Sequence, residues 1–195
     1  MFLWIILFVS GITFAQQGYK IGDKAKDFKL KNVDGEMVSM SMYDDAKGFI
    51  VIFTCNHCPY SVAYEDRINE LDKKFKSQGY PVIAINPNDP AVQPQDSFEN
   101  MKKRATEKAF TFPYLFDDGQ KVFPDYGATR TPHVFVLNKE ADDLIVRYIG
   151  AIDNNHTDAS AASEKFVQDA VNALLKDNKP DPDFTKAIGC TIKKK

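Results

Sequence analysis

The segment Phe49–Thr54 constrains the fold more than any other, because it is apolar at every position except its last. A short continuous apolar run is typical of a strand that is covered on both faces of a sheet. The sequence Cys-Asn-His-Cys-Pro follows directly at 55–59, and apolar residues then recur at helical spacing from Tyr64 to Phe75. We therefore expect a central strand, a tight junction that carries two cysteines, and a helix.

The remaining segments predict an alternation of strands and helices. A second buried strand is expected at 81–85, and Phe98, Met101 and Ala105 mark one face of a helix. Apolar runs at 133–137 and 144–149 predict a hairpin, and a last helix is expected to carry the apolar residues of 166–174. Near the start, Asp34-Gly35 between alternating segments predicts another hairpin. This order is typical of an α/β sheet with an antiparallel edge.

Length and composition predict one globular domain. The chain has 195 residues, of which 44% are hydrophobic and 27% charged, which is enough for a well-buried core. A formal net charge of −2 gives no electrostatic reason to expect nucleic acid or an anionic membrane as a partner. We expect a single domain at 16–195 with a C-terminal tail from about residue 177.

The first residues predict export. An apolar run at 2–9 is followed by Thr13-Phe14-Ala15, which is typical of a signal peptide with a cleavage site after Ala15. The competing interpretation is a retained membrane anchor, but about 14 apolar-leaning residues fall short of the roughly 20 that span a bilayer. We expect a periplasmic or secreted protein that has no stable membrane association once residues 1–15 are removed.

The pattern of the three cysteines favours chemistry over structure. A disulfide between Cys55 and Cys58 would close almost no loop and so would add little stability. Cysteines at the start of a helix are instead activated, because the free N–H groups and partial positive charge there favour the thiolate. We expect Cys55 to attack a partner's disulfide and Cys58 to resolve the mixed disulfide. Half of a zinc site has the same spacing, but no second Cys-x-x-Cys or His-x-x-x-His follows.

Three motifs in the same order resemble the thioredoxin superfamily, in particular the redoxin (AhpC/TSA-like) branch that secreted thioredoxin-like reductases share with the peroxiredoxins. They lie at 22–30, 53–59 and 126–132. The resemblance implies a thioredoxin-like α/β fold, with a central mixed β-sheet flanked by helices and an N-terminal β-hairpin extension. It also implies a cis peptide bond before Pro132, which would lie against the cysteines, and a Thr131 backbone that pairs with an extended substrate segment.

The chain departs from both relatives at informative positions. Peroxiredoxins carry a Thr three residues before the reactive cysteine and a Pro four residues before that Thr. Those positions hold Ile52 and Gly48 ahead of Cys55, and Cys55 and Val51 ahead of Cys58. A thiol peroxidase with antioxidant activity is therefore the second hypothesis. Thioredoxin has a buried Asp where this chain has Phe49, so no proton acceptor for Cys58 is assigned.

His57, Asn56 and Cys190 are further candidate residues, the first two for tuning the thiol pKa. His57 and Cys190 each have two interpretations. His57, together with Asn56, lies between the cysteines, where a partly cationic ring would stabilise the Cys55 thiolate and make the couple more oxidising. The alternative is an exposed ring with little effect. Cys190, near the C-terminus, is interpreted first as a small buried or tail residue and second as an extra resolving or intermolecular thiol.

The leading hypothesis is a thiol-disulfide oxidoreductase that exchanges disulfides with protein partners, and with an unidentified redox partner, outside the cytoplasm. It would need no cofactor and no metal. A copper-delivery protein on the same fold is the non-enzymatic alternative. Such proteins space their cysteines by three residues rather than two, and His133 is the only further ligand that the sequence offers.

Overall fold

The computed structural model describes residues 18–195, and the leader predicted at residues 1–15 lies outside them. An eight-stranded sheet in the order β1-β9-β8-β4-β5-β6-β2-β3 forms the centre, and β10 and β7 form a separate two-stranded sheet. The strands are β1 (Lys24–Ala25), β2 (Leu30–Asn32), β3 (Met37–Val38), β4 (Gly48–Phe53), β5 (Val82–Asn86), β6 (Tyr114–Phe116), β7 (Arg130–Thr131), β8 (His133–Glu140), β9 (Asp143–Gly150) and β10 (Cys190–Thr191). The helices are α1 (Pro59–Phe75), α2 (Phe98–Glu107), α3 (Val122–Tyr126) and α4 (Phe166–Leu174), with short 3-10 turns at 40–42, 76–78 and 94–96.

The sheet is mixed, and β4 lies at its centre. It pairs parallel with β5 and antiparallel with β8. Every residue of β4 is buried, which confirms the prediction of a strand covered on both faces. Ile50 and Ile52 belong to the apolar core on one face, and Phe49, Val51 and Phe53 belong to the core on the other. This alternation follows from the two-residue period of a strand.

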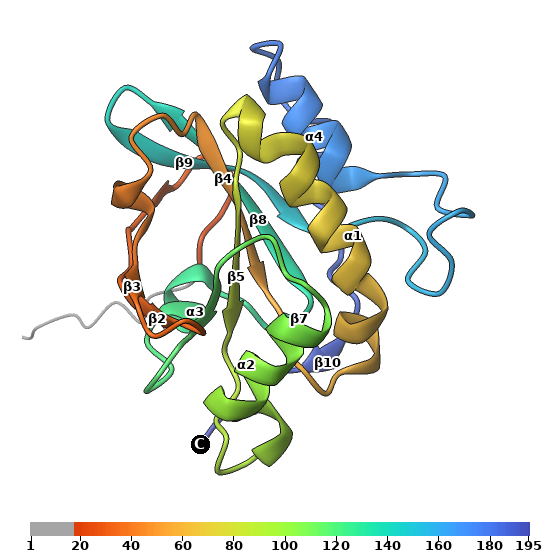
Figure 1. The fold of residues 1–195 in the computed structure, drawn as a ribbon. Coiled ribbons are helices and arrows are strands. Elements are labelled where there is room, and N and C mark those ends of the chain that lie inside the picture. The colour runs from red at the N-terminus through yellow and green to blue at the C-terminus, as the bar shows by residue number, and fades with distance from the viewer. Residues whose placement is uncertain (1–17) are drawn as a thin grey trace, which may run out of the picture.

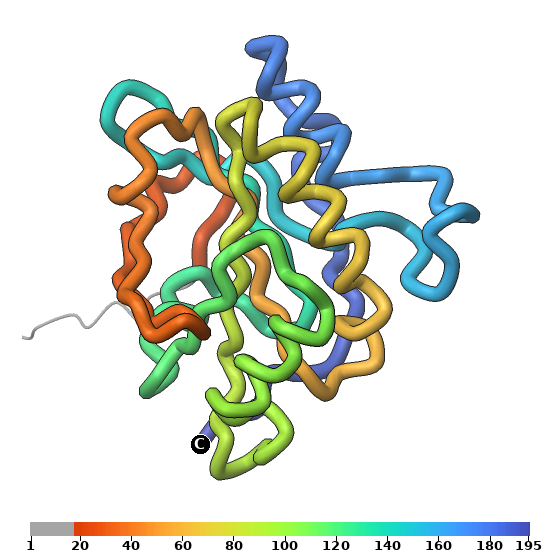
Figure 2. Tube along the Cα trace, in the orientation of Figure 1, coloured from red at the N-terminus to blue at the C-terminus, as the bar shows by residue number. Residues whose placement is uncertain are grey.

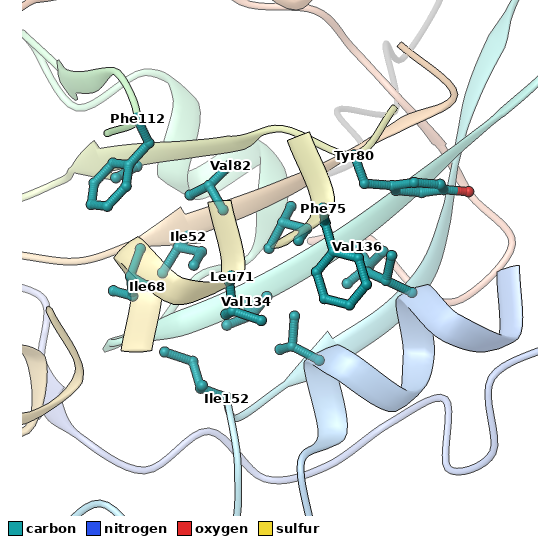
Figure 3. Packing of buried hydrophobic residues seen from close by; sticks show 14 of the residues in the cluster. Ile52, Ile68, Leu71, Phe75, Tyr80, Val82, Phe112, Val134, Val136 and Ile152 are labelled. Atoms are coloured by element: carbon teal, nitrogen blue, oxygen red, sulfur yellow. The ribbon is translucent and has the colours of Figure 1, made fainter. Parts of the chain in front are cut away.

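Two helices cover the first of these faces. Figures 1 and 2 show α1 and α4 side by side in front of the sheet. Ile68, Leu71 and Phe75 of α1 point onto the residues of β4, β5 and β8 in Figure 3. The spacing of these three residues is that of one face of a helix. The predicted helices at 59–75, around 98–105 and at 166–174 are thus confirmed as α1, α2 and α4.

Hairpins lie at the edges of the sheet. The predicted turn at Asp34-Gly35 joins β2 to β3, and β2 also pairs with β6, so this N-terminal hairpin extends the sheet. The predicted hairpin at 133–149 is β8–β9, and β1 pairs with β9 at the opposite edge. The sequence pattern gave no indication of β6, α3, β7 or β10, which span two to five residues each. Elements this short do not complete a period of either kind.

The chain ends in a segment that packs on the domain, and we call residues 189–195 the C-terminal strap. Its strand β10 pairs antiparallel with β7, so that Cys190 lies opposite Thr131. Ile192 is buried in the second apolar core, with 3% of its surface exposed. The backbone N–H of Lys193 donates to Asn88 Oδ1 at 2.7 Å, and its carbonyl oxygen accepts from Gln120 Nε2 at 2.8 Å. The strap is therefore a bonded part of the fold.

Within residues 18–195, none of the helices has both the length and the apolar composition needed to cross a membrane.

Candidate active site

The two cysteines lie at the junction between β4 and α1, as predicted. Helix α1 begins at Pro59, and Cys58 is its N-cap residue. The carbonyl oxygen of Cys58 accepts from Val62 N at 2.9 Å, which closes the first helical turn. Cys55 lies three residues earlier, in the loop between strand and helix. The backbone N–H of Cys58, the N-cap residue, is hydrogen-bonded to the sulfur of Cys55, so the partial positive charge of the first helical turn acts on both cysteines.

The loop before β8 brings a second segment against both sulfurs. The Thr131-Pro132 peptide bond is cis, as the resemblance implied. Cys55 Sγ lies 3.2 Å from Thr131 Oγ1, and Cys58 Sγ lies 3.1 Å from the Thr131 carbonyl oxygen, to which its thiol donates when protonated. Cys55 and Cys58 are free thiols and are 2% and 0% exposed. The predicted residues Cys55, Cys58, Thr131 and Pro132 therefore meet at one place.

The two thiols titrate as a pair. The hydrogen bond between them lowers one thiol pKa and raises the other, so that the pair holds one proton and one negative charge. Cys55 Sγ lies beside the Thr131 hydroxyl and accepts from the Cys58 backbone N–H, whereas Cys58 Sγ lies against the Thr131 carbonyl oxygen, to which a protonated thiol donates. These contacts favour the thiolate on Cys55 and the shared proton on Cys58.

Asp96 is a site residue that the sequence did not reveal. Its buried carboxylate accepts from Asn56 N at 2.8 Å, from His57 N at 3.3 Å and from His57 Nδ1 at 2.6 Å. It also accepts from Asn88 Nδ2 at 2.7 Å. The only available signal was topological: Asp96 follows β5, and β5 runs parallel to β4, so the loops after both strands leave the sheet at the same edge.

These contacts define what His57 and Asn56 do. His57 Nδ1 carries the proton that it donates to Asp96, and it lies 3.7 Å from Cys55 Sγ. The side chain of Asn56 donates to the Gln95 carbonyl oxygen at 3.0 Å and accepts from Tyr114 Oη at 3.0 Å. Both residues anchor the cysteine loop to neighbouring segments. Their effect on the Cys55 thiolate stays a prediction.

Cys55, His57 and Asp96 are also the one group of three potential metal ligands that residues 18–195 bring within 4.8 Å of one another. The Asp96 oxygens, however, already accept four hydrogen bonds, and His57 Nδ1 is one of the donors. This arrangement matches a carboxylate that orients a loop rather than a metal ligand. His133, which the copper hypothesis nominated, does not belong to this group.

Cys190 lies on the other side of Cys58. Its backbone N–H points at Cys58 Sγ, with a distance of 3.4 Å between nitrogen and sulfur. Burial, followed by the hydrogen bond to Cys58, raises the pKa of the Cys190 thiol to about 11. Cys58 is therefore the middle member of a row of three sulfur-bearing residues.

His133 is buried in β8, where its Nδ1 accepts from Thr129 N at 3.3 Å. Burial lowers its pKa from 6.5 to about 4. Between these two pH values the unfolded chain binds a proton at this position that the folded chain does not. The contribution of neutral His133 to the unfolding free energy is thus fully present above pH 6.5, and it is lost as the pH falls toward 4.

We expect His133→Asn to flatten this pH dependence, because asparagine offers an acceptor oxygen to Thr129 but has no titrating ring. Between neutral pH and pH 4, the unfolding free energy of the wild type should fall by up to about 3 kcal/mol more than that of the variant. Urea unfolding of both proteins across this range measures the difference, in which the contribution of all other titrating groups cancels. Parallel curves would contradict a neutral buried His133.

Comparison with known proteins identifies the family. The sequence model of the AhpC/TSA family matches residues 21–149. The chain belongs to the AhpC/TSA family. This match covers the strand-to-helix junction, both of its cysteines and the cis-proline loop, and it ends before α4 and the C-terminal strap.

Curated relatives with a named activity share about a quarter of their aligned residues with this chain. Thiol-disulfide oxidoreductase ResA from Halalkalibacterium halodurans is 24% identical over 123 residues, which are 63% of this chain and 65% of that protein. ResA from Geobacillus thermodenitrificans is 28% identical and matches 61% of this chain. The chain thus spans slightly less than two thirds of the length of these relatives.

Solved structures match over more of this AhpC/TSA chain. An uncharacterized conserved protein from Geobacillus kaustophilus is 34% identical, with a TM-score of 0.81 over 90% of this chain and 93% of that one. A hypothetical protein from Sinorhizobium meliloti 1021 is 27% identical, with a TM-score of 0.83 over 92% and 97%. The exposed lipoprotein thioredoxin Etrx1 from Streptococcus pneumoniae, at 20% identity and a TM-score of 0.57 over 78% and 99%, shares the fold. The predicted thioredoxin-like fold is therefore confirmed.

Proposed function

We propose that this AhpC/TSA-family protein is a thiol-disulfide oxidoreductase that exchanges disulfides with protein partners through Cys55 and Cys58. One observation carries the proposal: two free thiols lie together at the N-terminus of a helix and against the cis-Pro132 loop. A thiolate that is present at neutral pH and has a resolving thiol beside it is what disulfide exchange requires. The ResA relatives carry the same activity in their name.

In this mechanism Cys55 attacks, and Cys58 resolves. The Cys55 thiolate bonds to one sulfur of the partner's disulfide, and the other partner sulfur leaves as a thiolate. Cys58 then loses its proton to that leaving group and bonds to Cys55, which releases the second partner sulfur. The partner gains two electrons, and the chain gains one disulfide. These are the roles expected from the sequence, and the Thr131 hydroxyl beside Cys55 and the Thr131 carbonyl oxygen beside Cys58 support them.

The thiolate that the pair holds bears on its reduction potential. A stabilised thiolate stabilises the reduced protein, and that makes the reduction potential less negative. We therefore expect the Cys55–Cys58 couple to be more oxidising than a dithiol without such stabilisation. A site outside the cytoplasm is consistent with such a couple, and the signal-peptide pattern at 1–15 is the support for that location.

Equilibration with glutathione buffers of known potential tests this proposal, with the ratio of reduced to oxidised protein read by mass after thiol alkylation. Insulin reduction in the presence of dithiothreitol tests exchange with a protein partner. The matched control is the double variant Cys55→Ser/Cys58→Ser, which keeps Cys190. An exchange rate no higher than that of the control would refute the proposal.

Peroxide reduction is the second candidate, because a thiolate at pH 7 is also the group that reacts with hydrogen peroxide. Peroxidoxin BcpB from Mycobacterium tuberculosis has a related fold, with 19% identity and a TM-score of 0.57. In this chain, however, neither cysteine has the peroxidase threonine three residues ahead of it, because that position holds Ile52 ahead of Cys55 and Cys55 ahead of Cys58. We expect slow peroxide consumption in stopped flow, and a rapid second-order reaction would favour the peroxidase instead.

A further inference from the structure

The backbone of the C-terminal strap packs directly against the backbone of the cis-proline loop. An added Cβ at Gly189 would stand 2.1 Å from the Thr131 carbonyl oxygen and 3.1 Å from Pro132 N. Only a residue without a side chain brings the strap backbone this close to Thr131 without a shift of one of the two. The residue that follows Gly189 is Cys190, which pairs with Thr131 across the β10–β7 ladder.

The strap therefore occupies the backbone edge that an extended substrate would use. Its direction is antiparallel to β7, and its bonds are backbone pairs that any peptide could form. Figure 1 places β10 beside β7 and near the N-terminal end of α1. An incoming peptide can take this position only after the strap has left it.

The strap also places a thiol beside Cys58. Cys190 N lies 3.4 Å from Cys58 Sγ, and a hydrogen bond between the two side chains contributes to both of their pKa shifts. Cys190 is half-buried, whereas Cys55 and Cys58 are buried. Cys58 thus has two thiols within reach, one from the preceding loop and one from the end of the chain.

The attachment of the strap suits a segment that can open. Ile192 is its one buried apolar residue, and the remaining contacts are hydrogen bonds, including two from Arg130 Nη1 to Gly189 O at 3.2 Å and to Thr191 Oγ1 at 3.4 Å. A segment with one apolar anchor and several exposed hydrogen bonds opens locally at a small fraction of the cost of global unfolding.

We propose that Cys190 is a third redox thiol, which the strap delivers to Cys58 as an internal peptide substrate. This proposal rests on the proposed disulfide exchange. The Cys190 thiolate attacks the Cys55–Cys58 disulfide at Cys58 Sγ, so that the Cys58–Cys190 bond forms, the Cys55–Cys58 bond breaks, and Cys55 takes the proton of Cys190. Attack by Cys55 on Cys58 reverses the step. No electron is gained or lost, and the chain keeps one disulfide while Cys55 becomes a free thiol.

Peptide mapping of Cys55→Ser after treatment with diamide tests the proposal without relying on enzymatic activity. Diamide takes up two electrons and two protons as one disulfide forms. Trypsin releases both Cys55 and Cys58 in the peptide 48–67 and Cys190 in the peptide 187–193. A Cys58–Cys190 bond therefore links two peptides, and we expect this cross-link in most of the monomeric variant.

Two pairs of variants separate a delivered thiol from a merely nearby one. Cys58→Ser keeps Cys55 and Cys190, and we expect no monomeric cross-link in it. In the Cys55→Ser background, Ile192→Asp should detach the strap and lower the rate of cross-linking by about tenfold or more, because the effective concentration of Cys190 falls. The matched control is Ile188→Asp, which changes a neighbouring side chain that is 54% exposed and should leave the rate unchanged.

The outcomes for Cys190 and for the proposed function are separable. No monomeric cross-link in Cys55→Ser, or a rate that is the same in Ile192→Asp and Ile188→Asp, overturns the role of Cys190. Insulin reduction by Cys190→Ser then reports on the Cys55–Cys58 couple alone. If Cys190→Ser exchanges disulfides while the cross-link fails, the proposed function stands and this inference falls. If the cross-link forms while neither wild type nor Cys190→Ser exchanges, the reverse holds.

Discussion

Cys55→Ser is expected to abolish disulfide exchange, with a loss of at least about a thousandfold, because it removes the thiol that makes the first attack. Cys58→Ser/Cys190→Ser should instead complete the first attack and stop there. Incubated with oxidised glutathione, this double variant should accumulate a mixed disulfide, visible in the intact mass as one glutathione adduct and located by digestion on peptide 48–67. The asymmetry follows from the contacts of the two sulfurs, because Cys55 faces the Thr131 hydroxyl and Cys58 faces the Thr131 carbonyl oxygen.

The matched control for this experiment is Cys55→Ser/Cys190→Ser, which keeps Cys58 as its single thiol. We expect no adduct at neutral pH within the same time. An adduct on this control together with none on Cys58→Ser/Cys190→Ser would give the attacking role to Cys58 instead.

Titration of the thiolate absorbance is expected to show that the Cys55–Cys58 pair loses its first proton well below the ordinary thiol range in the folded protein. At pH 6 an ordinary thiol is less than about 1% ionised, whereas the pair should already show thiolate absorbance, at least about tenfold more than an ordinary thiol. Absorbance does not require a reagent to reach the buried sulfur. The reference is the same protein in urea, where the low-pH step should disappear and all three thiols should titrate in the ordinary range.

Single substitutions show whether the step belongs to the pair. Both Cys55→Ser and Cys58→Ser should move the first ionisation to higher pH, because each loses the hydrogen bond between the two thiols. A wild-type step in the ordinary thiol range would contradict the proposed activation of the pair.

The sequence was sufficient for the parts of the fold that rest on local periodicity. The continuous apolar run at 49–54 and the helical spacing from Tyr64 to Phe75 predicted β4 and α1, because burial on two faces or on one leaves a pattern of its own. The two residues of β10 leave no such pattern. Their partner, β7, lies about sixty positions earlier in the chain, and only the folded structure brings the two together.

The same distinction between local patterns and long-range contacts applies to the residues of the site. Cys55, Cys58, Thr131 and Pro132 stand in motifs and were predicted, whereas Asp96 is forty residues from the loop it binds. The contacts of the two sulfurs come from Thr131, which lies more than seventy residues away in the chain. The sequence pattern therefore could not show how each sulfur is bonded.

Asn88 is bonded to two segments at once. Its Nδ2 donates to the carboxylate of Asp96, which holds the cysteine loop, and its Oδ1 accepts from Lys193 N near the end of the chain. The last residues are thereby only one amide group away from the loop that carries the reactive sulfur. A truncation or substitution that removes the bond between Lys193 and Asn88 is thus a change to the redox centre, although it lies far from the cysteine motif in the sequence.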